Sequence, residues 1–507
     1  MLYKKYTFGD TDVYYTQCKD LGAGLMLFPA GTQIEDVDAL SPDCMVQAAL
    51  RGARNLIDYS QGITMRNMSS TLLSVVSQQA DGKGVVTRLS DGEGNDYEHT
   101  LRYDAETGVF SVRAEYFNNS GKTQVLESLQ SFSLSGIFNT EREKPGTEGL
   151  RLVRMTSAWS RECRLKEEEF SSLGFDMSWA RYGVKCERFG QLGSMPNRGY
   201  FPFAAIAGGG VTWAAMLEAP YSWQIEVYKE KETCALSGGL SDYEFGHWCK
   251  EIPAGGGFKT HCAYLRVKKT ENIDEVCNDF VRYQDGRLRV PESEESMPVL
   301  FNEYCTTWGT PSEENILAIL ESIKGLPIGT FVIDAGWYLP ENCGWCNAIG
   351  DWNESKKLFP GGIGRVVSAI RAAGMKAGVW FEFENVAADS KKFGDEDCLI
   401  KRNGVPLTSK NRRFLDLRKR EVQEYLQGKM LDFLADKGFE YIKIDYNDTF
   451  GIGGDGAESF GESGRQITEL SLDYLARLRE AVLGIVIENC SSGGSRIEPL
   501  RMHKVSK

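Results

Sequence analysis

The chain has 507 residues, of which 42% are hydrophobic and 25% charged, a composition typical of a globular protein that excludes intrinsic disorder. It carries 58 basic and 71 acidic residues, and the resulting formal charge of −13 argues against a nucleic-acid partner or an anionic membrane surface. No run of 18 apolar residues is present, so we expect no membrane-spanning helix and no membrane partner.

The N-terminus and the cysteines bear on the location of the protein. The first ten residues, MLYKKYTFGD, lack the apolar core of a signal peptide. The 13 cysteines are an odd number without a paired framework, so we expect reduced thiols in a cytoplasmic protein. Cys343 and Cys346 form a C-x-x-C pair, but no second pair or nearby histidine completes a zinc site. We therefore expect no metal and no other cofactor.

Histidine is scarce, with only His99, His247, His261 and His503 in the chain. A His-rich metal centre or a Ser-His-Asp triad needs histidine on the catalytic scaffold. Any chemistry is therefore expected to rest mainly on carboxylates.

Short runs with strand character occupy the chain up to about residue 290. The runs 100–103 and 109–116 flank the sequence DAETG at 104–108, which predicts a hairpin with Gly108 at a positive φ. Further expected strands cover 125–132, 210–217 and 223–228. Strands at this spacing, with few helical stretches between them, predict a large β-sandwich domain over residues 1–290.

From residue 291 to residue 507 the pattern changes to alternating strands and helices. The expected strands are 299–304, 330–334, 376–382, 441–445 and 485–488. The first expected helix is capped by Ser312, and three further helices are expected over 364–373, 422–437 and 465–482. Five such repeats indicate a parallel sheet, in either a (β/α)8 barrel or a doubly wound fold. No G-x-G-x-x-G follows the first strand, which favours the barrel.

Polar side chains follow the expected strands where each strand ends. Examples are Asn302, Asp334, Glu382, Asp445 and Asn489. In a barrel these ends meet on one rim, where the active site lies. Carboxylates, amides and tryptophans together suit a sugar site. Two simpler interpretations stay open, because Asp334 could cap a helix and the tryptophans could be loop packing.

Lys443, Asp445 and Asn447 alternate along the fourth strand and therefore point to the same side. A lysine beside a carboxylate favours its ionised form. An ionised carboxylate at the mouth of a barrel is a candidate nucleophile. The alternative is a purely structural ion pair.

Several stretches together resemble glycoside hydrolase family 36, the α-galactosidase and raffinose-synthase group. The matching sequences are KIDYN at 443–447, GDW at 350–352 with FPGG at 359–362, GVWFE at 378–382, CSSGGSR at 490–496 and WSRE at 159–162. Each is weak alone, whereas the combination is specific.

The resemblance implies an N-terminal β-supersandwich, a central (β/α)8 TIM barrel and a C-terminal β domain. It implies retaining hydrolysis of terminal α-linked galactose from oligosaccharides through a covalent glycosyl-enzyme, without a metal. Under this resemblance Asp445 would be the catalytic nucleophile. The implied substrate-binding residues are Asp334, Trp337, Trp380, Lys443, Asn447, Cys490 and Gly493.

The chain departs from the family pattern at two small points. Ala335 stands where the family usually has a second aspartate, and a lost charged hydrogen bond is worth about 1.5–3 kcal/mol. The family's arginine before an L-D motif aligns best with Lys410, and Arg412 and Arg413 remain alternatives.

A larger departure concerns the general acid. The family places it in an S-D segment about twenty residues after the C-S-x-G-G loop, so we expect it to be absent from this chain. The barrel is then expected to be incomplete, with about five βα units and no strand six. Glu498 is the nearest alternative acid.

Other functions remain open at this stage. They are an α-N-acetylgalactosaminidase, a raffinose-synthase-like transglycosylase, and an inactive sugar-binding fragment that lacks the general acid. The expected partner is an α-galactoside oligosaccharide, and the family resemblance also suggests a homo-oligomer.

Overall fold

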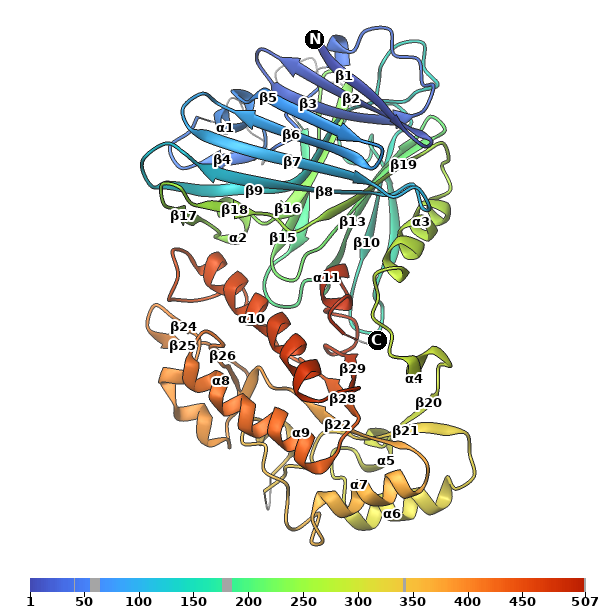
Figure 1. The fold of residues 1–507 in the computed structure, drawn as a ribbon, viewed down its shortest axis with the longest axis vertical. Helices are drawn as coiled ribbons and strands as arrows, with labels where there is room; N and C mark the ends of the chain where they lie inside the picture. Colours follow the sequence, from blue (N-terminus) through green and yellow to red (C-terminus); the bar gives the residue numbers. More distant parts are fainter. Residues whose placement is uncertain (41, 55–63, 176–184, 341–342, 506–507) are drawn as a thin grey trace. The chain divides into compact units, whose positions relative to one another are not determined.

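The structure is a computed structural model that describes residues 1–507 except 41, 55–63, 176–184, 341–342 and 506–507 (Figure 1). Its contacts divide the chain into two compact units. The first unit comprises Met1–Leu192 and Pro196–Arg287, and the second comprises Gly193–Met195 and Leu288–Lys507.

The first unit consists mainly of three antiparallel sheets. A small sheet contains β1 (Leu2–Phe8), β2 (Thr11–Cys18) and β3 (Gly22–Pro29), in that order. A second sheet contains β4 (Ala48–Leu50), β9 (Gln124–Ile137), β12 (Lys185–Gln191), β15 (Trp223–Glu230), β16 (Thr233–Leu240) and β17 (Lys250–Ile252). Its order is β12-β15-β16-β9-β17, and β4 pairs with β9 outside that path.

The third and largest sheet of this unit has ten strands. They are β5 (Ser74–Asp81), β6 (Gly84–Ser90), β7 (Asn95–Tyr103), β8 (Phe110–Asn118), β10 (Arg151–Thr156), β11 (Arg164–Glu169), β13 (Tyr200–Gly208), β14 (Val211–Leu217), β18 (Gly257–Lys259) and β19 (Ala263–Lys268). The order is β11-β10-β13-β14-β19-β8-β7-β6-β5, with β18 paired to β8. The helices of the unit are short except α3: η1 (Asp38–Leu40), α1 (Met68–Thr71), α2 (Tyr243–Gly246) and α3 (Ile273–Asp285).

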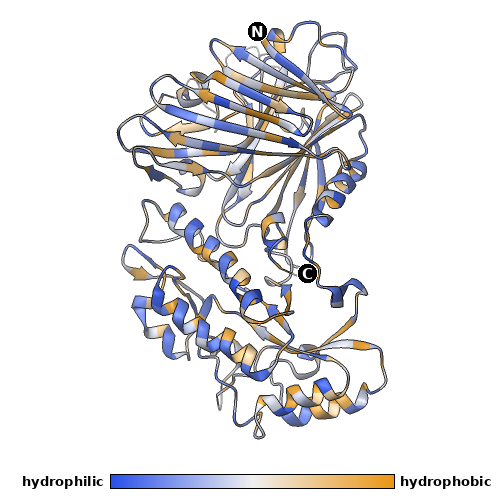
Figure 2. Cartoon of the chain, viewed as in Figure 1, coloured by the Kyte–Doolittle hydropathy of each residue, from blue (hydrophilic) through white to orange (hydrophobic). Residues whose placement is uncertain are grey.

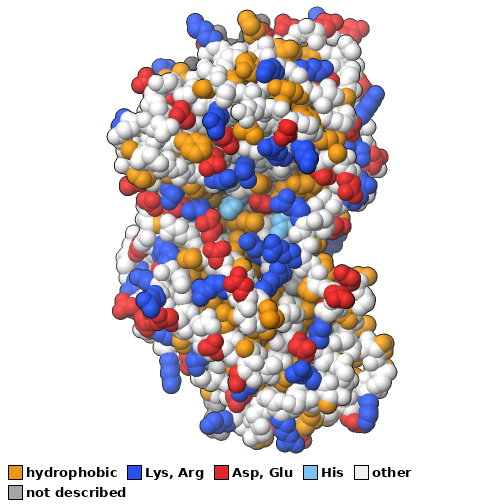
Figure 3. Space-filling model, in the orientation of Figure 1, with side chains coloured by type: hydrophobic (Ala, Val, Ile, Leu, Met, Phe, Trp, Pro, Cys, Tyr) orange, Lys and Arg blue, Asp and Glu red, His pale blue; other side chains and the backbone are white. Residues whose placement is uncertain are grey.

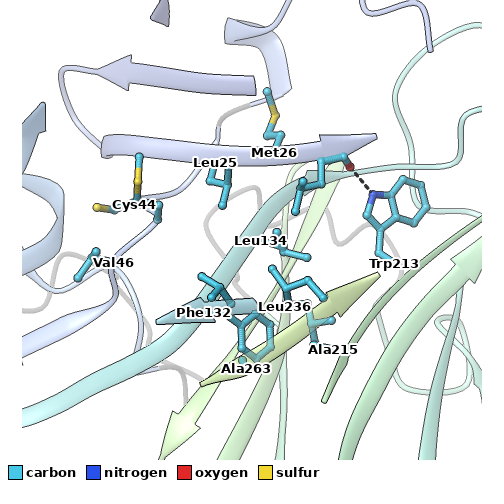
Figure 4. Close-up of a cluster of buried hydrophobic side chains, with 14 of the residues drawn as sticks. Leu25, Met26, Cys44, Val46, Phe132, Leu134, Trp213, Ala215, Leu236 and Ala263 are labelled. Carbon is cyan, nitrogen blue, oxygen red and sulfur yellow. Dashed lines mark hydrogen bonds between the residues drawn. The ribbon is translucent and has the colours of Figure 1, made fainter. Parts of the chain in front are cut away.

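Apolar side chains from these sheets form one large core, as expected for a β-sandwich. Along β7 and β8 buried and less buried residues alternate, and Figure 2 shows the matching alternation of hydrophobic and hydrophilic residues. Figure 4 shows part of the core, in which Phe132, Leu134 and Leu236 belong to the same buried cluster as Trp213. The indole Nε1 of Trp213 donates to the carbonyl oxygen of Leu27 at 2.7 Å, which satisfies the one polar atom of this side chain. The predicted sandwich is confirmed.

The hairpin predicted at 104–108 joins β7 to β8 in the structure. Gly108 has a φ of +74°, and a Cβ at this position would lie 2.7 Å from the guanidinium carbon of Arg266. Glycine is therefore required here both for its backbone conformation and for the lack of a side chain.

The second unit contains a five-stranded parallel sheet. Its strands are β20 (Val299–Asn302), β21 (Ile328–Ile333), β22 (Lys376–Phe381), β28 (Tyr441–Ile444) and β29 (Val486–Asn489), and neighbours in the sheet follow chain order. A doubly wound sheet reverses direction at a switch point, whereas barrel strands follow one another in sequence. The barrel-type arrangement with five βα units is therefore confirmed. Among the described residues the sheet is open, with β20 and β29 at its edges.

Helices connect these strands. They are α4 (Glu292–Glu295), α5 (Tyr304–Thr307), α6 (Glu313–Ser322), α7 (Ile363–Ala372), α8 (Arg420–Leu426), α9 (Asp432–Lys437), α10 (Phe460–Ala481) and α11 (Pro499–Met502). The helix predicted over 422–437 is interrupted by a π-helical turn at Gln427–Leu431, which separates α8 from α9. Ser312 caps α6 as expected, since its Oγ accepts from the backbone N–H of Asn315 at 3.1 Å.

An insertion between β22 and α8 was not predicted. It contains β23 (Asn385–Ala387), β24 (Lys401–Arg402), β25 (Val405–Pro406), β26 (Thr408–Ser409) and β27 (Arg412–Phe414), with 3-10 helices at Lys391–Gly394 and Glu396–Cys398. A further 3-10 helix, Trp345–Asn347, follows β21. The strands of the insertion have only two or three residues, too few to show a periodic pattern.

The surface agrees with the mixed charge of the sequence. On the face that Figure 3 shows, acidic and basic side chains are interspersed over each unit. Among the described residues no helix combines the length and the apolar character that a membrane span requires.

Candidate active site

The carboxyl ends of neighbouring parallel strands bring the main polar side chains of the second unit together. Trp380 on β22 pairs with Lys443 on β28, and Asp334 and Asp445 directly follow β21 and β28. These residues come from three separate segments, of which the first and the last are more than 100 residues apart, and only the sheet register places them side by side. The rim expected from the sequence is present for this set.

Asp445 is a carboxylate of this rim that accepts four hydrogen bonds. Its Oδ1 accepts from the backbone N–H groups of Tyr446 at 2.8 Å and Ser492 at 3.0 Å. Its Oδ2 accepts from Asn447 Nδ2 at 2.8 Å and from Trp380 Nε1 at 3.2 Å. The residue is 9% exposed. Four donors thus converge on one nearly buried carboxyl group.

These donors decide the charge of Asp445. Burial raises its pKa, but the hydrogen bonds from Asn447 and Ser492 and the positive charge of Lys443 outweigh burial and lower the pKa below its ordinary value. The group is therefore an anion at neutral pH, which is the state that a nucleophile needs.

Lys443 pairs with Asp334 and not directly with Asp445. Its Nζ lies 2.9 Å from Asp334 Oδ2, and Asn302 Nδ2 donates to the same oxygen at 2.6 Å. Burial lowers the pKa of Lys443, but the Asp334 carboxylate outweighs burial and raises it. Asp334 does not cap a helix, so the simpler interpretation of this residue is wrong.

Glu382 is a buried carboxylate beneath the rim. Its Oε1 accepts from Arg412 Nη1 at 2.6 Å and from the backbone N–H of Asn447 at 2.9 Å. Its Oε2 accepts from Asn447 Nδ2 at 2.9 Å. Burial and the nearby charge of Asp445 raise the pKa of Glu382, and Arg412 opposes that rise. The Asn447 amide therefore bridges two carboxylates.

The sequence left three basic residues, Lys410, Arg412 and Arg413, as candidates for the cation of this site, and the structure places them differently. Arg412 reaches this network through Glu382. Lys410 is exposed, and Arg413 donates to the carbonyl oxygen of Phe393 at 2.8 Å with its guanidinium 4.3 Å from the Phe393 ring centroid. A position two residues from the best alignment thus supplies the cation.

Trp337 does not line the rim. It is fully buried, and its Nε1 donates to the carbonyl oxygen of Trp380 at 2.9 Å. Its ring stacks on Phe433, with 5.0 Å between the centroids. In the structure Trp337 thus supports Trp380 through this hydrogen bond, and its expected contact with substrate stays a prediction.

Trp345 is an aromatic neighbour of the rim that the sequence analysis missed. Its ring meets Trp380 edge-on at a centroid distance of 5.8 Å, and Tyr304 at 6.1 Å. A Cβ on Gly309 would lie 2.2 Å from Trp345 Cδ1, so the neighbouring backbone leaves room only for glycine. Trp345 begins a 3-10 helix of only three residues, which is too short for periodicity to give a signal.

The loop after β29 closes over Asp445. The Cys490 N–H donates to the Ile444 carbonyl at 2.8 Å, and Ser491 Oγ donates to the Tyr446 carbonyl at 3.0 Å. Ser492 and Gly493 have φ values of +47° and +88°, which turn the Ser492 N–H toward Asp445. Burial and the nearby Asp445 carboxylate raise the pKa of Cys490 to about 12, so its thiol stays protonated.

Arg496 anchors the same loop. Its Nη1 donates to Glu384 Oε1 at 2.6 Å, and its Nε donates to the carbonyl oxygen of Ser194 at 2.7 Å. The guanidinium lies 3.4 Å from the ring centroid of Tyr446, whose OH is 2.8 Å from Ser194 Oγ. Ser194 belongs to the second unit although it lies about 100 residues before the rest of it. No motif in the sequence pointed to this residue.

Neither Glu382 nor Glu498 is placed as a general acid beside Asp445. Glu382 is paired with Arg412 and lies beneath Asn447. Glu498 caps α11, because its Oε1 accepts from the Arg501 N–H at 2.6 Å and its Oε2 from the Leu500 N–H at 2.9 Å. The alternative that Glu498 serves as the acid is therefore not supported by its position.

Residues 258–507 match the family model described as Melibiase. The α-galactosidase Mel36A of Lactobacillus acidophilus is 28% identical over 269 residues, which are 52% of this chain and 36% of the relative. The α-galactosidase 1 of Pediococcus pentosaceus is 26% identical over 334 residues, 62% of this chain and 44% of the relative. The chain thus matches less than half of the length of these two relatives.

Solved structures with the same fold cover nearly the whole chain. The α-galactosidase from Lactobacillus brevis has a TM-score of 0.76 and 19% identity, over 99% of this chain and 72% of that one. The GH36 α-galactosidase AgaB from Geobacillus stearothermophilus has a TM-score of 0.79 and 16% identity, over 99% and 73%. At these identities the likeness shows the fold.

Proposed function

We propose that this chain, a relative of the α-galactosidases of glycoside hydrolase family 36, carries the nucleophile of a retaining α-galactosidase. The substrate is terminal α-linked galactose of an oligosaccharide. One observation carries the proposal: Asp445 is ionised, nearly buried and held by four donors at the carboxyl end of a parallel barrel strand. The catalytic domain is proposed as residues 291–507, after a sandwich domain of residues 1–290.

In the proposed reaction a carboxylate oxygen of Asp445 attacks the anomeric carbon and forms a covalent glycosyl-enzyme. The backbone donors from Tyr446 and Ser492 hold the carboxylate so that it need not reorganise during the attack. Lys443 and Asp334 lie next to this group as a charged pair and are proposed to bind sugar hydroxyls. Trp380, Cys490 and Gly493 are proposed to shape the same subsite.

A retaining hydrolase also needs a second carboxyl group about 5 Å from the nucleophile, to protonate the departing oxygen and then to deprotonate water. Neither Glu382 nor Glu498 is in a suitable position, because the first pairs with Arg412 and the second caps α11. A test on this chain therefore uses a substrate that needs no acid. Fluoride leaves without protonation, so the formation of the glycosyl-enzyme from α-galactosyl fluoride reports on the nucleophile without the acid.

The experiment combines turnover with covalent trapping. A 5-fluoro-α-galactosyl fluoride is expected to label Asp445, and the peptide that contains it is expected to gain one fluorogalactosyl group in the mass spectrum. Asp445→Asn should abolish both labelling and turnover. Asp448→Asn is the matched control, because Asp448 lies three residues away and contacts the backbone N–H of Thr449. Labelling of another carboxylate would defeat the proposal.

A second candidate is a sugar-binding protein without turnover, in which the charged pair of Lys443 and Asp334 would bind sugar hydroxyls. Calorimetry that shows galactose binding with neither labelling nor release of fluoride would support it. Two of the solved structures hold oligosaccharides, since AgaA from Geobacillus stearothermophilus was crystallised with stachyose and with raffinose. We propose these α-galactosides as the first substrates to compare, together with N-acetylgalactosaminides and product analysis for transfer. A cytoplasmic location and a homo-oligomer also remain proposals.

A further inference from the structure

Lys392 lies at the centre of a charged cluster that the proposed reaction does not use. Its Nζ donates to Asp395 Oδ2 at 2.7 Å, to Glu421 Oε1 at 3.3 Å and to the Sγ of Cys398 at 3.4 Å. The same ammonium lies 5.2 Å from the ring centroid of Tyr425. All of these residues belong to the second unit.

The thiol of Cys398 is held by the same carboxylate as the ammonium. Cys398 is 1% exposed, forms no disulfide, and its Sγ donates to Asp395 Oδ2 at 3.2 Å. Burial and the hydrogen bond to Asp395 raise the pKa of the Cys398 thiol to about 11. At neutral pH the cluster therefore holds a thiol and an ammonium in contact, with Asp395 placed to accept a proton from either.

The same cluster contains a group of potential metal ligands. The ligand atoms of Asp395, Cys398 and Glu421 lie within 4.8 Å of one another. The Nζ of Lys392, however, lies between 2.7 and 3.4 Å from all three of them. This ammonium already forms an ion pair with each of the two carboxylates, and a metal ion would have to displace it. The distinctive feature of the cluster is therefore the contact between the Lys392 ammonium and the Cys398 thiol.

We propose that Lys392 and Cys398 form a covalent and reducible Nζ–O–Sγ bridge when the protein is exposed to dioxygen. The Sγ–H bond and two of the three N–H bonds of the ammonium break, and one N–O and one O–S bond form. One oxygen atom of dioxygen becomes the bridge, and the other leaves as water with two of the three hydrogens. The third hydrogen leaves as a proton, which Asp395 is placed to accept. Sulfur and nitrogen each lose two electrons, and dioxygen takes up four.

The bridge would join the two 3-10 helices Lys391–Gly394 and Glu396–Cys398 within the insertion between β22 and α8. The insertion leads on to β27, which carries Arg412. A cross-link over so few residues restricts the unfolded chain only slightly. The expected effect is therefore a small rise in melting temperature, reversed by a thiol reductant.

The test uses the unmodified chain, purified without oxygen and then divided into aerated and anaerobic samples. The aerated sample is expected to show a cross-linked tryptic peptide with one oxygen more and two hydrogens fewer than the unmodified peptide. In isotopically heavy dioxygen this peptide should carry one heavy oxygen atom. Dithiothreitol should restore the original mass.

Two controls make the result specific. Lys392→Arg keeps the positive charge but removes the primary amine, and should abolish the modification. Arg51 Nη2 lies 3.3 Å from Cys249 Sγ, a similar contact without a lysine, and should remain unmodified. An unchanged mass after prolonged aeration, or the same mass change in Lys392→Arg, would overturn the proposal. A loss of two hydrogens without added oxygen would do so as well, because it indicates a direct S–N bond. None of these readouts depends on galactosidase activity.

Discussion

Glu382 holds Asn447 at two points: its Oε1 accepts from the Asn447 backbone N–H at 2.9 Å, and its Oε2 accepts from Asn447 Nδ2 at 2.9 Å. The second hydrogen of that amide is directed at Asp445 Oδ2 at 2.8 Å. Glu382 therefore fixes the orientation of the Asn447 side-chain amide. In this orientation the amide nitrogen, and not the amide oxygen, faces Asp445. This arrangement leads to the first prediction.

Glu382→Gln should lower the turnover of α-galactosyl fluoride by about 10- to 100-fold, since a charge-assisted hydrogen bond contributes about 1.5–3 kcal/mol. A glutamine amide facing Asn447 competes for the same orientation and weakens the hold on Asp445. Removal of one partner also leaves Arg412 buried beside a neutral group, so the free energy of unfolding should fall by about 3–5 kcal/mol. Kinetics and urea titration of the variant measure the two effects.

The control for Glu382→Gln is Asp81→Asn, which breaks the exposed ion pair between Asp81 and Arg102. Surface pairs contribute about 0–1 kcal/mol, so neither turnover nor stability should change appreciably. Full activity of Glu382→Gln would show that Asn447 keeps its hydrogen bond to Asp445 without the Glu382 carboxylate.

The pH dependence of the reaction should follow Asp445. Its folded pKa lies below the ordinary value, so the ionised form persists to a lower pH than in an exposed aspartate. The corresponding stability is present above the unfolded pKa and is lost as the pH falls through the folded pKa. Asn447→Ala removes the strongest of the pKa-lowering contacts, and the acid limb of kcat/KM on α-galactosyl fluoride should move to higher pH. Asn353→Ala, an exposed residue bound to Lys429, should leave that limb in place.

His99 on β7 predicts a second pH effect, located in the sandwich. It is completely buried, and neither ring nitrogen has a hydrogen-bond partner among the described residues. Burial lowers its pKa from 6.5 to about 4. The unfolded chain therefore binds the proton first, and stability falls as the pH drops from about 6.5 toward 4, by about 3 kcal/mol in total.

The variant that tests this is His99→Leu, which removes the titrating group and fills the apolar site. Its stability should fall less between pH 7 and pH 5 than that of the parent chain, as measured by urea denaturation at each pH. His247→Asn changes an exposed histidine at a φ of +57°, which asparagine tolerates, and should keep the parental pH dependence. Parallel pH curves for the parent and His99→Leu would refute the assignment.

Gly193 tests the short segment that joins the second unit from far along the chain. It has a φ of +91°, and a Cβ would lie 2.7 Å from Thr449 Oγ1 and 2.9 Å from the Gly451 carbonyl oxygen. Gly193→Ala therefore combines backbone strain with a clash and should cost about 2–4 kcal/mol. Gly325→Ala has a similar φ of +79° but open space, and should cost only about 1–2 kcal/mol. Thermal unfolding of both variants separates the effect of backbone strain from that of the clash. Equal losses of unfolding free energy would show that the backbone around Gly193 shifts to accommodate the added Cβ.

The sequence alone determined the features of this protein that depend on short stretches of chain. Strand and helix periods of two and 3.6 residues predicted the sandwich, the five barrel strands and most of their helices, because those patterns record which face of each element is buried. The chemistry at the strand ends, with Asp334, Lys443 and Asp445, was also readable, since parallel strands carry their carboxyl ends to one edge.

Tertiary structure alone decided which side chains touch. Arg412 rather than Lys410 reaches Glu382, because the short strands of the insertion set a register that the sequence does not display. Trp337 is buried beneath Trp380, whereas Trp345 and Ser194 approach the rim from segments without any periodic signal. Such contacts depend on close packing between segments distant in the chain, and a one-dimensional pattern records the need for burial but not the identity of the neighbour.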